Sequence, residues 1–149
     1  CLSKDAFILS QSFPQFANNI LFGRHIFDAM ISDLKQKILA ILAENKNKVL
    51  IFGITFKTQV KTDDTRDSHT TALLEQLKKE KAINLKNIIL YDPVLDKRPS
   101  QLNDFDFVKD LGELNLRDDE ILYVKYMNQY SDHAKIPVKI NMRMIEWGL

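Results

Sequence analysis

Two short segments hold the side chains with the clearest potential for chemistry. Residues 1–5 place a thiol, a cation and a carboxylate within five positions. Residues 53–57 and the polar stretch 62–68 that follows them include Lys57 and Arg66, which are cationic donors suited to phosphate. A simpler interpretation is that both cations pair on the surface with neighbouring carboxylates. Those carboxylates are Asp63, Asp64 and Asp67.

The second segment joins a predicted buried strand to a predicted helix. Residues 49–54 form a continuous apolar run, which is typical of a strand covered on both faces. Residues 68–81 have helical apolar spacing, and Asp67 or Ser68 is suited to cap the helix. Ligands of open α/β sheets bind at the carboxyl edge of the strands, and a helix N-terminus there favours anions. Position alone therefore favours a phosphorylated ligand. The chain contains neither a Gly-x-Gly-x-x-Gly turn nor a Walker loop.

The pattern along the whole chain predicts an α/β fold. Residues 3–45 are expected to be helical, with an amphipathic helix at 26–44, and Pro14 and Gly23 interrupting or bounding the helices before it. Further strands are expected, at residues 87–91, 105–108, 120–126 and 138–142. We therefore predict a helical N-terminal arm over 1–46, and a Rossmann-like three-layer domain with a mostly parallel sheet over 47–149.

Composition excludes several classes of protein. The 149 residues are 45% hydrophobic and 28% charged, with a net charge of +1, which is the profile of a globular domain. No basic stripe suggests nucleic acid as a partner, and no apolar run approaches the roughly 18 residues of a membrane span. A single cysteine fits a reducing compartment, so a cytoplasmic location is expected. The histidines lack metal-ligand spacing, and no metal is expected.

Together, the two segments resemble the UDP-glucose/GDP-mannose dehydrogenase family of nucleotide-sugar 6-dehydrogenases. The family's C-terminal signature reads approximately Gly-x-x-Phe-Lys, a short loop, Asp-Asp or Gly-Asp, and Arg-(Glu/Asp)-Ser, to which residues 53–68 are similar. Tyr91-Asp92-Pro93 follows at the expected distance. Residues 1–5 resemble the catalytic motif Gly-Gly-x-Cys-x-Pro-Lys-Asp, with Ser3 in place of the proline. The loop before Arg66 is longer than the family's usual one.

The resemblance implies a catalytic role for three residues at the start of the chain. Cys1 would be the thiolate nucleophile that traps the intermediate aldehyde as a thiohemiacetal, and the thioester formed from it would be hydrolysed. Lys4 would favour the thiolate form of Cys1 and would stabilise the oxyanions that form during the reaction. Asp5 would orient or deprotonate the water.

The resemblance also implies how substrate and cofactor bind. Phe56 and Lys57 would contact the nucleotide sugar. Arg66, with Cys1 and Lys4, would contact NAD, most of which an N-terminal dinucleotide-binding domain would hold. UDP-glucose, oxidised to UDP-glucuronate, is the expected substrate, because the Lys-Asp pair after the cysteine resembles enzymes acting on UDP-glucose and GDP-mannose. GDP-mannose and UDP-N-acetylhexosamines remain alternatives.

Interpretations from other classes stay open. The chain could be a non-catalytic nucleotide-sugar-binding module, or a hydrolase that uses Cys1 as an N-terminal nucleophile. Because the chain begins at Cys1 without methionine and lacks a glycine-rich dinucleotide turn, we expect a fragment that is inactive alone. In the family the corresponding central helix supports dimer contacts. Residues 1–46 would then end a central helical domain, and a homodimer is expected through the helix at 26–44.

Overall fold

The computed structural model describes residues 2–43, 48–55, 62–66, 68–110, 112, 121–126 and 143–147. At residues 2, 3, 121–126 and 143–147 it describes the backbone alone. No helix in these residues combines the length and apolar character of a membrane span.

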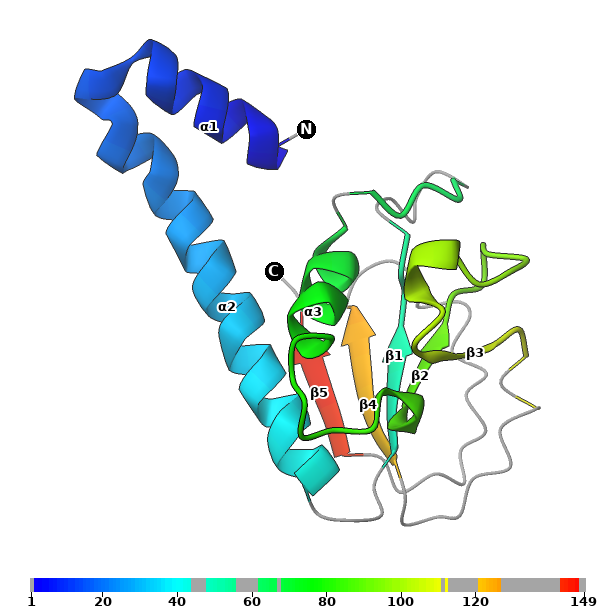
Figure 1. Cartoon of the computed structure of the whole chain (residues 1–149). Helices are drawn as coiled ribbons and strands as arrows, with labels where there is room; N and C mark the ends of the chain where they lie inside the picture. Colours follow the sequence, from blue (N-terminus) through cyan, green and yellow to red (C-terminus); the bar gives the residue numbers. More distant parts are fainter. Residues whose placement is uncertain are drawn as a thin grey trace.

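The chain begins with a helical hairpin. Helix α1 (Leu2–Ser12) is followed by a short 3-10 turn, η1 (Pro14–Phe16), and then by the long helix α2 (Ala17–Ala43). Pro14 is the first residue of η1 and bounds the two helices as predicted. The hairpin extends beyond the carboxyl ends of the strands in Figure 1. The prediction that Gly23 interrupts a helix is wrong: α2 runs through it, because one glycine costs a helix only about 1 kcal/mol.

The rest of the described chain is a parallel five-stranded sheet with short helical elements (Figure 1). The strands are β1 (Lys48–Phe52), β2 (Ile88–Tyr91), β3 (Asp106–Val108), β4 (Ile121–Tyr126) and β5 (Arg143–Trp147). The helical elements are α3 (His69–Leu77), η2 (Leu85–Asn87) and η3 (Ser100–Leu102). The strand order is β3-β2-β1-β4-β5, with every neighbouring pair parallel. This order is that of a doubly wound Rossmann sheet, so the predicted α/β fold is confirmed.

The core is built around β1. Side chains alternate across a strand, so Val49 and Ile51 face the cluster formed with α2 and α3, while Leu50 and Phe52 face the other way. All four are buried, which confirms the prediction of a strand covered on both faces. The second half of α2 contributes buried side chains to the same cluster, namely Ile31, Leu34 and Ile38. The domain division at 46/47 stays a prediction.

Candidate functional site

The carboxyl edge of β1 and β2 is shaped first by Gly53. Its φ of 89° lies in the left-handed region that glycine adopts without strain. The Gly53 N–H donates to the Tyr91 carbonyl over 2.9 Å, and its own carbonyl accepts a 2.6 Å bond from Thr70 Oγ1. Gly53 therefore ties the end of β1 to β2 on one side and to the first turn of α3 on the other.

Asp92 follows β2 and is 1% exposed. Its Oδ2 accepts from the backbone N–H of Ile54 (2.7 Å), from the N–H of Thr55 (2.9 Å) and from Thr55 Oγ1 (3.1 Å). Its Oδ1 accepts from the Val94 N–H over 2.9 Å. A buried carboxylate thus joins the segments that leave two neighbouring strands.

Ser68 is the N-cap of α3, and it is one of the two residues predicted for that position. Its Oγ accepts from the Thr71 N–H over 2.9 Å, and Thr71 Oγ1 donates to the Thr65 carbonyl over 2.8 Å. The ring of the next residue, His69, packs in a tilted arrangement against Phe27 of α2, with 4.5 Å between the ring centroids, and burial lowers the pKa of its imidazole. The start of α3 is therefore fixed both to the preceding loop and to the long helix.

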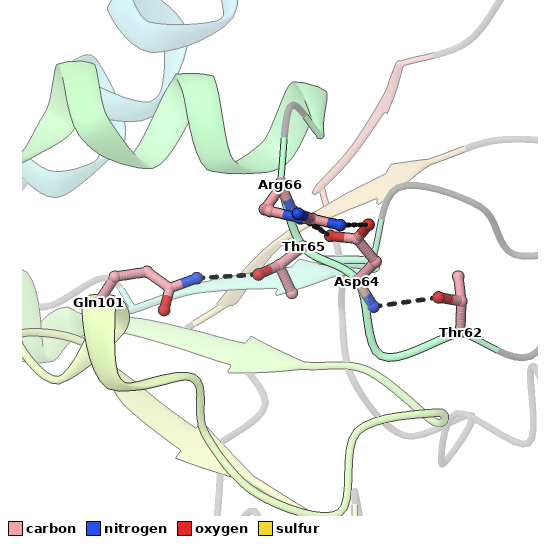
Figure 2. A network of polar contacts seen from close by, with 5 residues as sticks. All are labelled: Thr62, Asp64, Thr65, Arg66 and Gln101. Carbon is pink, nitrogen blue, oxygen red and sulfur yellow. Dashed lines mark hydrogen bonds and ion pairs between the residues drawn. The ribbon is translucent and has the colours of Figure 1, made fainter. Parts of the chain in front are cut away.

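Arg66 lies in the loop before α3, where Figure 2 shows it folded onto Asp64. Its Nε and Nη2 donate to Oδ1 and Oδ2 of Asp64, each over 2.9 Å. The hydrogen bonds from Arg66 lower the pKa of Asp64 to about 2. The Arg66 side chain is 85% exposed. The surface pairing suggested by the sequence is therefore present for Arg66, and the described loop offers an exposed guanidinium at this edge.

The same loop is anchored at Thr65, which is buried. Gln101 of η3 donates from Nε2 to Thr65 Oγ1 over 2.9 Å (Figure 2). Neither Gln101 nor the buried role of Asp92 was predicted from the sequence. Contacts across 36 and 38 positions of the chain leave no local signal in the residues themselves.

The predicted catalytic and substrate residues are only partly within the described chain. Lys4 and Asp5 lie exposed on α1, away from the Arg66 loop in sequence. Cys1, Phe56 and Lys57 lie outside the described residues, with Phe56 directly after Thr55 in the sequence. Within the described chain, no group of three or more histidine, cysteine, aspartate or glutamate side chains could hold a metal ion.

Comparison with known families places this edge in a wider context. The sequence profile of the UDP-glucose/GDP-mannose dehydrogenase family, UDP binding domain, matches residues 50–143. The match starts within β1 and ends at the first residue of β5, so it includes the Arg66 loop, α3 and Asp92. No curated protein was found to match the chain.

Proposed function

The chain belongs to the UDP-glucose/GDP-mannose dehydrogenase family, and from that premise we propose that it binds a UDP-sugar at the carboxyl edge of β1 and β2. The observation that carries the proposal is the match of the UDP binding domain to residues 50–143. The strand order supports it, because sheets of this type bind ligands at the point where the order reverses, which in this sheet lies between the carboxyl ends of β1 and β4. The segment that leaves β1 there leads through Phe56 and Lys57, which are the proposed substrate contacts.

The proposed reaction is the oxidation of UDP-glucose to UDP-glucuronate. Each NAD, when bound, would accept one hydride, so two molecules of NAD are needed in turn. Cys1 attacks the C6 aldehyde left by the first hydride transfer, and the resulting thiohemiacetal loses the second hydride to become a thioester. Water adds to the thioester carbon, the C–S bond breaks, and the carboxylate and the thiolate are released. Lys4 favours the thiolate and balances oxyanion charge, and Asp5 holds the attacking water.

Arg66 is the proposed cofactor contact in the described part of the chain. A guanidinium matches pyrophosphate oxygens with two parallel N–H donors, as it matches the carboxylate of Asp64 here. NAD binding at this point requires Arg66 to exchange Asp64 for a phosphate group of the cofactor. The chemistry of the donor set therefore fits a dinucleotide phosphate.

The proposed oligomer is a homodimer. Seven large apolar side chains on the helical hairpin are at least 46% exposed: Phe7, Ile8, Leu9, Phe13, Phe16, Phe22 and Ile26. On the long helix, by contrast, Ile31, Leu34 and Ile38 are buried within the chain's own core. This distribution favours an interface through α1 and the first half of α2, with less contribution from the residues after position 30.

Calorimetric titration of the chain with UDP, UDP-glucose, GDP and GDP-mannose tests the binding function. We expect UDP and UDP-glucose to bind and Lys57→Ala to weaken both, with exposed Lys97→Ala as the control. Tighter binding of GDP-mannose would point to the alternative substrate, and the absence of any nucleotide binding would sink the proposal. A Cys1→Ser variant of the complete enzyme separates the dehydrogenase from a non-catalytic module, because acid formation should stop while UDP affinity persists.

A further inference from the structure

Asp92 is the charged side chain that the described residues bury most completely, at 1% exposure. Burying a carboxylate is costly unless hydrogen bonds replace its hydration. Here four donors do so, three of them on Oδ2 and one on Oδ1. The three backbone N–H donors lie at 2.7 to 2.9 Å, which is the range of good N–H···O hydrogen bonds, and the Thr55 hydroxyl lies at 3.1 Å.

These donors come from two different segments. Ile54 and Thr55 leave the carboxyl end of β1, and Val94 belongs to the turn after β2. The Gly53–Tyr91 bond already completes the pairing of the two strands up to this point. Asp92 therefore adds order beyond the sheet, in the backbone that continues toward the proposed substrate contacts.

Fixing that backbone before a ligand arrives has a consequence for affinity. A binding segment that is ordered in advance loses less conformational entropy when the ligand binds. Without the carboxylate, the N–H groups of Ile54 and Thr55 would be left without an acceptor in a buried setting, and the backbone would have to shift to find water. An apolar side chain at position 92 could fill the volume but could not accept hydrogen bonds from these N–H groups.

We infer that Asp92 is a positioning residue for nucleotide-sugar binding, which it supports by fixing the backbone of Ile54 and Thr55 at the end of β1. The inference rests on the proposed function, since it gives Asp92 a role in the affinity of that same edge. Asp92 acts through the segment that leads to Lys57 and makes no contact with the ligand itself. Thr55 contributes to the same hydrogen-bonded arrangement, because its hydroxyl donates to Oδ2 of Asp92.

The test is a set of matched variants titrated with UDP. Asp92→Asn keeps the shape but replaces one of the two acceptor oxygens with an NH2 group, which must face either the Val94 N–H or the N–H groups of Ile54 and Thr55. This substitution should weaken UDP binding by about tenfold. Thr55→Val removes only the hydroxyl and should weaken binding about threefold, whereas Thr55→Ser keeps the donor and should restore the affinity. Asp96→Asn, an exposed carboxylate in the same turn region, should leave affinity unchanged. Circular dichroism checks that each variant is folded.

A double-variant cycle separates positioning from a general loss of structure. If Asp92 acts through the segment carrying Lys57, Asp92→Asn should weaken UDP binding far less in a Lys57→Ala background than in the unsubstituted chain. Fully multiplicative losses, or unchanged affinity in folded Asp92→Asn, would overturn the inference while leaving the proposed function intact. If Asp92→Asn fails to fold, equal affinities of Thr55→Val and Thr55→Ser would overturn it instead. Absence of UDP binding by the unsubstituted chain would overturn the proposed function, and this inference with it.

Discussion

The Arg66 guanidinium donates two parallel hydrogen bonds of 2.9 Å to the carboxylate of Asp64, and only one residue separates the two in the sequence. The backbone N–H of Arg66 donates to the same carboxylate over 3.0 Å. The loop therefore orders its own cation locally, while Thr65 between them is anchored in the opposite direction by Gln101. The guanidinium is held in place and is still exposed, which is compatible with the proposed contact to a cofactor phosphate.

The ionisation of Asp64 should depend on Arg66. Because the pKa of Asp64 is lowered from 3.8 to about 2, the pairing contributes stability that is complete above pH 3.8 and is lost as the pH falls toward 2. At about pH 3, Asp64 should be mostly ionised in the unsubstituted chain and more protonated in Arg66→Ala, which loses the guanidinium donors but keeps the backbone N–H donor at position 66. Carboxyl carbon NMR shifts measure this difference. Identical Asp64 titrations in the two proteins would contradict the assignment, and Arg98→Ala serves as the control.

Removing the N-cap of α3 should destabilise the fold. In Ser68→Ala the Thr71 N–H loses its acceptor, so the free energy of unfolding should fall by about 1 kcal/mol. Ser100→Ala, at an exposed serine that starts η3, should change it by less than about 0.5 kcal/mol. Urea denaturation followed by circular dichroism provides both values. Equal effects of the two substitutions would show that the Ser68 hydroxyl does not stabilise the start of the helix.

Two lysines of α2 should contribute differently to stability. Lys35 pairs with Glu80, beyond α3, over 2.7 Å, and the two side chains are 18% and 33% exposed. Lys37 pairs with Asp33 on its own helix over 2.6 Å, with exposures of 54% and 65%. Lys35→Met should therefore cost up to about 1 kcal/mol, and Lys37→Met about 0.3 kcal/mol, since solvent screens exposed pairs. Denaturation in low and high salt measures both costs, and a larger cost for Lys37→Met would contradict the prediction.

Local signals in the sequence predicted the elements around β1 well. The apolar run at 49–54 is long and rich in strand-forming residues, and Ser68 stands where a helix must begin, so both were recognisable without tertiary information. The predicted strand at 105–108 corresponds to β3, one residue shorter. The predicted strand at 138–142 lies outside the described residues. Strand β5 was missed, because Arg143 and Glu146 interrupt its apolar character.

The candidate site was predictable only in outline. Its place at the carboxyl edge follows from strand-to-helix order, which the sequence carries. The sequence does not reveal that Asp92 accepts hydrogen bonds from the Ile54 and Thr55 amides. Tyr91-Asp92-Pro93 has the pattern that ends a strand, and nothing local marks Asp92 as buried. The amphipathic stripe of α2 was similarly ambiguous, since core and interface residues have the same spacing. Only the packed structure separates Ile38, at 0% exposure, from Ile26, at 47%.

That separation leads to a prediction about the oligomer. Phe22 is 64% exposed in the single chain, so Phe22→Ser should scarcely change its unfolding free energy while removing apolar area from the proposed interface. Sedimentation velocity should show a dimer for the unsubstituted chain and a shift toward monomer for Phe22→Ser. Lys37→Ser, on the polar face of the same helix, should leave the dimer unchanged. A monomeric unsubstituted chain would exclude self-association through α1 and α2. An unaltered dimer in Phe22→Ser and in Phe7→Ser would place the interface elsewhere on the molecule.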